Sequence, residues 1–308
     1  MTATTGTDTS AFLGPEPESD GYGVAGRSEW LDIDWQQHLR SRVLNGARVN
    51  YVEMGEGPPV ILIHGLSGCW QNWLENIPHL ARNHHVVALD LAGFGESELP
   101  NEEISIPGYG RFVDAFLGSI GIERAALVGN SMGGFIAAET AISHPSRVDK
   151  LVLVSAAGLA RVGNRQLYAL ERAARLFHPV TAAFLARREH LVRRPGLRRR
   201  MLYGVVQYPE RIAPELAYEV ASGAGKPGFL DALDAIMDYD FRDRLPEVST
   251  PTLIVWGRND RIVPVDGADE YERLIPNARK VILEDTGHVP MLERPARFNQ
   301  LLEEFLGS

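Results

Sequence analysis

The sequence has few of the features that mark disulfide-linked, membrane-spanning or nucleic-acid-binding proteins. Only one of its 308 residues, Cys69, is a cysteine, so a scaffold of intrachain disulfides is excluded. No uncharged apolar run approaches the roughly 18–20 residues of a membrane span. Acidic residues outnumber basic ones by 40 to 31, which disfavours nucleic acid as a partner. With 44% hydrophobic and 23% charged residues, the composition is that of a folded globular protein.

Motifs for metals and nucleotides are also lacking. The sequence has no His-Glu-x-x-His pattern and no cluster of Cys and His residues, so we expect no metal site. The run Gly93-Phe94-Gly95 is rich in glycine but lacks the Gly-x-Gly-x-x-Gly spacing of a dinucleotide site. We therefore expect that the protein uses no cofactor.

Residues 1–26 are rich in Thr, Ser, Gly, Pro and acidic residues. The segment has neither a basic start nor an apolar centre, so it does not have the pattern of a signal peptide. We interpret it as a flexible tail, and we expect the protein to be cytoplasmic.

Short apolar runs that alternate with helical patterns predict an α/β fold. The runs do not alternate apolar with polar residues, which is typical of strands buried on both faces of a parallel sheet. They occupy residues 60–63, 86–89, 125–128, 151–154, 253–256 and 281–283, and an alternating pair near 38–54 predicts antiparallel edge strands. Helices are expected at about 70–82, 108–120, 131–143, 265–275 and 291–306. This order predicts a mostly parallel sheet with helices on both faces.

Residues 158–248 interrupt this pattern because they contain no convincing strand. Apolar residues recur at helical spacing within 170–177 and within 230–237, so we expect a helical insertion between two strands. Residues 161–200 contain eleven arginines and only two glutamates. We interpret these arginines as a solvated helix surface, and attraction to anionic substrates or to a membrane surface is the alternative. The predicted division is a tail at 1–26, a core at 27–157 and 249–308, and a helical insertion at 158–248.

The glycine-rich run from Gly129 to Gly134 is the strongest chemical motif. It follows the predicted strand 125–128, opens a predicted helix, and has Ser131 at its centre. Glycines two residues before and after Ser131 leave room for a turn so tight that the serine side chain projects from it. This strand–turn–helix context is that of a nucleophile elbow, and the alternative is a glycine-rich turn with a serine helix cap.

A serine hydroxyl is a weak nucleophile without a base, and His288 is the best placed histidine. It lies in the loop after the last predicted strand, 281–283. Loops at the carboxyl ends of strands line the ligand crevice of an open α/β sheet. The other eight histidines precede strands, end helices or fit surface and packing positions.

The base needs an acid that orients it, and Asp260 directly follows the predicted strand 253–256. Asp266 and Asp269 are rivals that belong to the next helix, and Asp285 is too near His288 in sequence to reach the far ring nitrogen easily. Ser131, Asp260 and His288 occur in the order nucleophile, acid and base, which is the order that accompanies a nucleophile elbow.

Two backbone N–H groups are candidates for an oxyanion hole. Leu66 lies in a glycine-flanked turn after strand 60–63, and Met132 directly follows Ser131. We expect His64 to hold its loop rather than to take part in the chemistry. Cys69 lies nearby, but no base for it is evident, so we do not expect it to be the nucleophile.

These motifs together resemble the α/β-hydrolase superfamily, in the branch with a serine nucleophile and an inserted helical cap. The resemblance runs from about Leu44 to the C-terminus, with a divergent cap. The motifs that carry it are His64-Gly65, Asp90-Leu91-Ala92-Gly93-Phe94-Gly95-Glu96-Ser97, Gly129-Asn130-Ser131-Met132-Gly133, Trp256-Gly257-Arg258-Asn259-Asp260 and Gly287-His288.

The resemblance implies hydrolysis of carboxylic esters through an acyl-enzyme on Ser131. Haloalkane dehalogenases and epoxide hydrolases carry an aspartate at the elbow, so Ser131 argues against both. Hydrolases of aromatic meta-cleavage products also use serine, often after an asparagine such as Asn130. Their usual Ser-Gly-Pro-Gly-like loop and the Trp after the histidine are absent here, where Leu66-Ser67-Gly68-Cys69 and Val289 occur. C–C hydrolysis of a dienoate stays an alternative, as does a small-molecule receptor with a hydrolase-like pocket.

The inserted helices would cover an apolar pocket that sets the size of the acyl or alcohol group. The expected partner is thus a small-molecule ester, and no oligomeric state is indicated. The candidate lining residues are Trp70, Trp73, Phe135, Phe229 and Met237.

Overall fold

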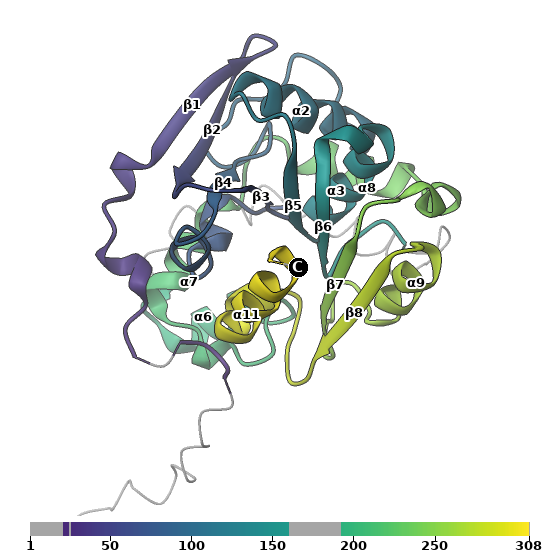
Figure 1. Cartoon of the computed structure of the whole chain (residues 1–308). Coiled ribbons are helices and arrows are strands. Elements are labelled where there is room, and N and C mark those ends of the chain that lie inside the picture. The colour runs from purple at the N-terminus through teal and green to yellow at the C-terminus, as the bar shows by residue number, and fades with distance from the viewer. Residues whose placement is uncertain (1–20, 25, 160–191, 308) are drawn as a thin grey trace, which may run out of the picture.

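An eight-stranded sheet forms the centre of the computed structural model, which describes residues 21–24, 26–159 and 192–307. The strands are β1 (Leu39–Leu44), β2 (Ala47–Met54), β3 (Pro59–Ile63), β4 (His85–Leu89), β5 (Ala125–Asn130), β6 (Val148–Val154), β7 (Thr252–Gly257) and β8 (Ala278–Leu283). Their order across the sheet is β1-β2-β4-β3-β5-β6-β7-β8 (Figure 1). The pairs β1–β2 and β2–β4 are antiparallel, and the other five are parallel. The predicted α/β fold is confirmed.

Helices cover both faces of this sheet. The first hydrophobic cluster packs the sheet against α2 (Ile106–Ser119), α3 (Met132–Ser143) and α9 (Asp266–Leu274). The second packs the opposite face against α1 (Ile77–Leu80) and α11 (Pro295–Leu306).

Alternate side chains of one strand enter opposite clusters. In β3, Ile61 and Ile63 belong to the first cluster, whereas Val60 and Leu62 belong to the second. All four are at most 1% exposed, because both faces of this central strand are covered. This double burial explains why the strand sequences are continuously apolar.

Two of the predicted helices are broken by proline. The segment expected as one helix at 70–82 is a 3₁₀ helix at Trp70–Trp73 followed by the single turn of α1, in which Pro78 is near the start. The helix expected at 291–306 is divided into α10 (Pro290–Glu293) and α11 by Pro295. The residue before a proline is disfavoured in the α region, and Arg294 accordingly has φ −135° and ψ 57°.

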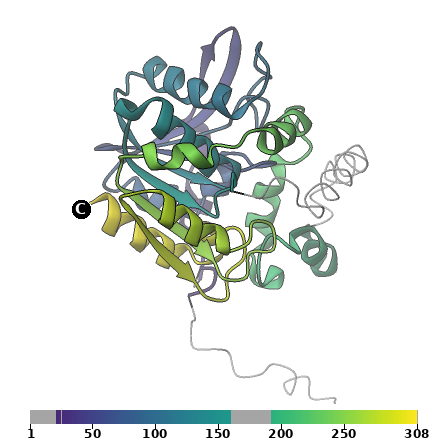
Figure 2. The same cartoon turned by 90° about the vertical axis from the view of Figure 1, so that its right-hand side faces the viewer.

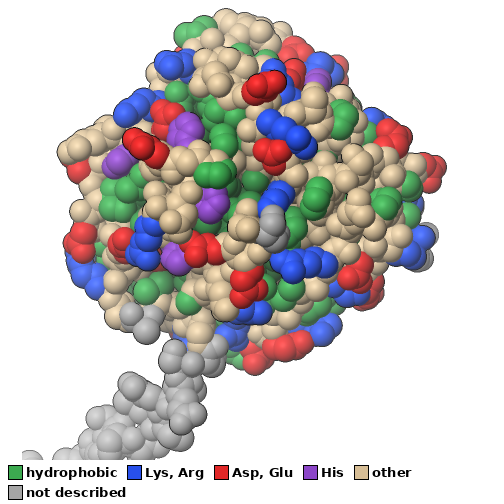
Figure 3. Space-filling view, viewed as in Figure 1, with side chains coloured by type: hydrophobic (Ala, Val, Ile, Leu, Met, Phe, Trp, Pro, Cys, Tyr) green, Lys and Arg blue, Asp and Glu red, His purple; other side chains and the backbone are tan. Residues whose placement is uncertain are grey.

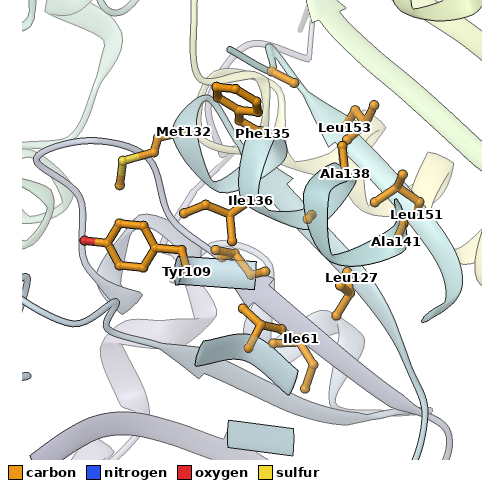
Figure 4. Packing of buried hydrophobic residues seen from close by; sticks show 14 of the residues in the cluster. Ile61, Tyr109, Leu127, Met132, Phe135, Ile136, Ala138, Ala141, Leu151 and Leu153 are labelled. Atoms are coloured by element: carbon orange, nitrogen blue, oxygen red, sulfur yellow. The ribbon is translucent and has the colours of Figure 1, made fainter. Parts of the chain in front are cut away.

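Helix α3, which begins directly after Ser131, is packed deeply into the first cluster. Figure 4 shows Ala138 beside Leu153 of β6 and Ile136 above Ile61 of β3, all within the first cluster. Eleven of its twelve residues are buried, so the helix is buried all round rather than on one stripe. Its buried face includes the polar Glu139 and Thr140, so it is burial on all sides that fixes its start, and with it Ser131.

The chain between β6 and β7 contains the helices α6 (Pro195–Leu202), α7 (Pro214–Val220) and α8 (Phe229–Asp238). They appear in green at one side of the sheet in Figure 2. Residues 160–191, including the helix expected within 170–177 and most of the arginine-rich run, lie outside the described residues.

Within residues 21–24, 26–159 and 192–307, no helix is both long and apolar enough to cross a bilayer. On the face shown in Figure 3, acidic and basic side chains of the described residues are interspersed rather than separated by sign.

Candidate active site

Ser131 occupies the tight turn between β5 and α3. Its backbone has φ 56° and ψ −118°, a region that residues other than glycine rarely adopt and that stores strain. Three backbone hydrogen bonds hold it there. Its N–H donates to the carbonyl of Val154 at 2.9 Å, and its carbonyl accepts from Phe135 at 3.1 Å and Ala157 at 3.0 Å. The turn is thus anchored to both β6 and α3.

The glycines on either side of Ser131 are required by close backbone approach. A Cβ atom on Gly129 would collide with the carbonyl of Gly133, and a Cβ on Gly133 would collide with the carbonyl of Ile63. Only glycine fits at both positions, as the elbow interpretation requires.

Asp260 and His288 are brought together from two neighbouring strands. Asp260 follows β7 and His288 follows β8, and the Asp260 Oδ2 atom lies 2.7 Å from His288 Nδ1. Asp260 Oδ1 accepts hydrogen bonds from the backbone N–H groups of Ile262 and Val263, both at 2.9 Å. A carboxylate can only accept, so Nδ1 carries the proton and Nε2 is left to accept one.

The backbone of His288 is held by two contacts that the sequence did not indicate. The Asn130 side chain donates to the His288 carbonyl at 3.2 Å and to that of Val154 at 3.1 Å. The His288 N–H donates to the carbonyl of Val205, in the segment between β6 and β7, at 2.8 Å. Asn130, next to Ser131 in the chain, therefore links the elbow directly to the loop of His288.

The first oxyanion candidate is in a loop that approaches Ser131, and the second directly follows Ser131 in the chain. Leu66 is in the loop after β3, and a side-chain carbon on its neighbour Gly65 would lie 3.0 Å from Ser131 Cβ. Met132 begins α3, and its side chain enters the core. Within the described residues, neither backbone N–H has a hydrogen-bond acceptor, so both are available as donors.

Ser131, His288 and Leu66 all line one cavity of about 1330 Å³. Most of the described lining is aliphatic, and much of it comes from the chain between β6 and β7. The aliphatic side chains from that chain that are larger than alanine are Leu159, Met201, Leu202, Val205, Val206, Ile212, Leu216, Val220, Leu233, Ile236 and Met237.

Charged groups in the described lining come mainly from the Asp260 loop, α9 and the end of α8. They are Asp240, Arg261, Asp266, Asp269, Glu270 and Arg273. Glu270 pairs with Arg242 and Arg273, and Asp269 pairs with Lys280. Half of these six charges are thus paired, and the other three are two carboxylates and Arg261, so this part of the lining offers little attraction to an anion. Nowhere in the described chain do three or more His, Cys, Asp or Glu side chains gather in a way that could hold a metal ion.

Comparison with known proteins agrees with this fold. Residues 58–295, more than three-quarters of the chain, match the family model described as the alpha/beta hydrolase fold. The chain belongs to the α/β-hydrolase family. The fold and family expected from the sequence are therefore confirmed.

Relatives of this α/β hydrolase include esterases and C–C hydrolases. It is 32% identical to a pimeloyl-(acyl-carrier protein) methyl ester esterase of Aeromonas hydrophila, over 84% of this chain and 99% of that protein. A membrane phospholipase A has 32% identity and a TM-score of 0.70, with 87% of this chain and 85% of that chain covered. A meta-cleavage product hydrolase of Pseudomonas fluorescens has 30% identity and a TM-score of 0.69, with 87% and 97% covered.

Of the five side chains expected to line the pocket of this α/β hydrolase, only Met237 does so. The expectation is wrong for Trp70 and Trp73, which are buried in the second cluster, where Trp73 packs on Phe298. It is also wrong for Phe135, which is enclosed in the first cluster (Figure 4). Phe229 begins α8, next to the point where Gly228 bonds to Gly93, and lies outside the lining.

His64 holds its loop, as expected, by hydrogen bonds from both ring nitrogens. Nδ1 lies 2.7 Å from the Gly65 carbonyl, to which it donates, and Nε2 accepts from the Leu91 N–H at 3.0 Å. Burial lowers the pKa of this imidazole to about 4. His64 is therefore neutral in the folded protein at ordinary pH.

Because of this buried imidazole, we expect the free energy of unfolding to decrease as the pH is lowered from about 6.5 to 4. In that window the unfolded chain binds a proton at His64 that the folded protein does not, so lowering the pH favours unfolding. The shift corresponds to a loss of about 3 kcal/mol by pH 4. Urea unfolding measures the free energy of unfolding of the wild type and of His64→Asn at each pH. The difference between the two proteins should become smaller by that amount as the pH is lowered through this window. A difference that stays constant with pH would contradict the assignment.

Cys69 is not poised as a nucleophile. Its thiol is buried and lies 3.2 Å from the hydroxyl oxygen of Ser222. Burial raises the pKa of the thiol to about 12, so it stays protonated at neutral pH. This agrees with the preference for Ser131.

Proposed function

We propose that this α/β hydrolase cleaves carboxylic esters through an acyl-enzyme on Ser131. The observation that carries the proposal is the 2.7 Å contact between Asp260 and His288, because His288 and Ser131 line the same cavity. An activated serine needs a base, and the base needs a group that orients it. The strained backbone of Ser131 supports the same role, because strain of this kind is concentrated at functional sites.

The proposed mechanism assigns one step to each group. His288 Nε2 takes the Ser131 proton as the hydroxyl oxygen attacks the ester carbonyl. The backbone N–H groups of Leu66 and Met132 donate to the developing oxyanion, and Asp260 stabilises the charged imidazole. His288 then returns the proton to the leaving alcohol. Water, activated by the same imidazole, releases the acid and frees Ser131.

We propose further that the chain between β6 and β7 acts as a cap that holds an aliphatic acyl group. Its side chains supply most of the aliphatic lining, and α8 contributes Leu233, Ile236 and Met237. Apart from the proposed base His288, the described lining contains only one aromatic side chain, Tyr239, so it offers little surface for stacking an aromatic ring. A flexible, neutral acyl chain fits this environment best.

C–C hydrolysis of a dienoate is the second candidate, supported by the similarity to a meta-cleavage product hydrolase. Such a substrate carries a carboxylate. Arg261 and Arg273 are the only cations in the described lining, and Arg273 is already paired with Glu270. This leaves Arg261 as the one cation there without a carboxylate partner, so the described lining favours the neutral ester.

A panel of p-nitrophenyl esters of increasing acyl length tests this function. We expect kcat/KM to rise up to about fourfold per added methylene until the cavity is filled, because each buried methylene contributes about 0.8 kcal/mol. Leu233→Trp should reduce kcat/KM for the longer esters and spare the acetate. Leu230→Trp, in the same helix but outside the lining, is the matched control.

The same enzyme sample should be tested by absorbance on a ring-fission dienoate. If the dienoate is turned over faster than every ester, the proposed ester hydrolysis is wrong and the protein is a C–C hydrolase. Equal kcat/KM for all acyl lengths would refute the aliphatic cap.

A further inference from the structure

The carboxylate of Glu293 lies behind the loop that carries His288. Its side chain is fully buried, although glutamate is rarely found without solvent contact. The Gly287 N–H donates to both carboxylate oxygens, at 2.9 and 3.0 Å, and the Val289 N–H donates to Oε1 at 3.3 Å. The residues on either side of His288 are thus attached to one buried anion.

The same carboxylate also binds two segments that are distant in sequence. Its Oε2 atom accepts from the backbone N–H of Gln207, in the proposed cap, at 2.7 Å. It also accepts from the hydroxyl of Tyr22 at 2.8 Å, and that hydroxyl in turn accepts from the N–H of Tyr208 at 3.0 Å. Glu293 therefore joins the histidine loop to the cap and to the N-terminal segment.

All three N–H groups of residues 287–289 are fixed by this arrangement. Two donate to Glu293, and that of His288 donates to the carbonyl of Val205, two residues before Gln207. A shift of the cap at Gln207 would pull on the same carboxylate that holds the loop. The 2.7 Å contact between His288 Nδ1 and Asp260 depends on where this loop lies.

We propose that Glu293 is a positioning residue, whose carboxylate holds the backbone on both sides of His288 and couples it to the cap at Gln207. The inference rests on the proposed function, because it gives Glu293 a part in the same reaction. It goes beyond that function because Glu293 neither lines the cavity nor belongs to the Ser131, Asp260 and His288 set.

The donors around Glu293 favour its ionised form. Burial raises the pKa of this carboxyl above its usual range, and the N–H groups of Gln207, Gly287 and Val289 together with the Tyr22 hydroxyl offset part of the rise. Three of the four donors are backbone N–H groups, which cannot accept, so an amide NH₂ at either oxygen would face a donor. An anion that accepts at both oxygens is the group that fits.

Glu293→Gln tests the proposal because it preserves the shape of the side chain but converts one acceptor into a donor. We expect kcat to fall about 10- to 100-fold, since a small misplacement of a catalytic group can reduce the rate about 100-fold. KM should change less than about threefold, because the lining of the cavity is untouched. Tyr22→Phe is the matched control. It removes one donor to the carboxylate, leaves both loop contacts in place, and should keep kcat within about threefold.

A second readout follows the imidazole itself. The Nδ1 proton shared with Asp260 should give a low-field ¹H NMR signal, assigned by its loss in Asp260→Asn. We expect this signal to shift or broaden in Glu293→Gln and to stay in place in Tyr22→Phe. Wild-type kcat and an unchanged signal in Glu293→Gln would overturn the proposal, even if the melting temperature falls, because Glu293 would then only stabilise the fold.

Glu293→Asp covers the case in which the glutamine variant does not fold. It keeps the charge but draws the carboxylate back by one methylene, so we expect the same selective loss of kcat and a shifted signal. A wild-type kcat and signal in this variant would equally overturn the proposal. The NMR readout needs no substrate. If the wild type hydrolyses no ester, the proposed function fails, and the signal still decides whether Glu293 positions His288.

Discussion

Ser131→Ala is expected to lower kcat for ester hydrolysis on the order of 10⁶-fold, the size of loss that follows removal of the nucleophile from a serine hydrolase. The structural reason is that the strained turn, with φ 56°, presents this side chain to the cavity. Alanine lacks the attacking oxygen but adopts the same backbone about as readily as serine. The variant should therefore fold as the wild type does and retain affinity for the ester.

Covalent labelling separates the loss of the nucleophile from a loss of folding. Intact-mass spectrometry after treatment with a fluorophosphonate should show one adduct on the wild type, at Ser131, and none on Ser131→Ala. Ser143→Ala makes the same change at the far end of α3, where the hydroxyl bonds only to Glu139 and Arg244, and should keep both activity and label. An adduct on Cys69, or an active wild type without any adduct, would overturn the assignment of the nucleophile.

The parts of this fold that could be predicted from sequence are those in which each strand is buried on both faces. Such strands must be continuously apolar, so β3, β5 and β7 stand out as runs between polar turns. The three proposed catalytic residues could be predicted from the positions of these strands. Side chains at the carboxyl ends of neighbouring parallel strands meet at one edge of the sheet, which is why Asp260 and His288 are in contact.

The pocket could not be predicted in this way, because the direction of a side chain depends on what its element packs against. Phe135 is only four residues from Ser131, but α3 is buried on all sides and directs this ring toward Tyr239 and Phe241. Trp73 is near the loop of Leu66 in sequence and yet packs against Phe298. Proximity in sequence to the site therefore does not indicate whether these large aromatic side chains line the pocket.

The contacts that hold His288 were equally hidden in the sequence. Asn130 and His288 are 158 residues apart, and no local pattern indicates that an amide will bond to that carbonyl. Val205 contributes a backbone carbonyl, for which the residue type carries no information. These contacts arise from the position of the segment between β6 and β7, which only the folded chain defines.

Asp260→Asn is expected to lower kcat by about 10⁴-fold, the loss seen when the orienting acid of a serine protease is neutralised. The local geometry fixes how the amide must lie. Asp260 Oδ1 accepts from the N–H groups of Ile262 and Val263, so the amide oxygen has to remain at that position. The NH₂ group then occupies the place of Oδ2 and faces His288 Nδ1, which must become the acceptor.

This reversal moves the imidazole proton to Nε2, where it blocks the removal of the Ser131 proton. The fold should be nearly unaffected, because two of the three hydrogen bonds of the side chain persist. Asp285→Asn is the matched control. It makes the same change in charge three residues from His288, at φ 49°, a conformation that asparagine tolerates well. Steady-state kcat should stay within about threefold of wild type in Asp285→Asn and collapse in Asp260→Asn, as neutralisation of an orienting acid implies. The opposite ranking would show that the acid of this site lies in the loop after β8 rather than in the loop after β7.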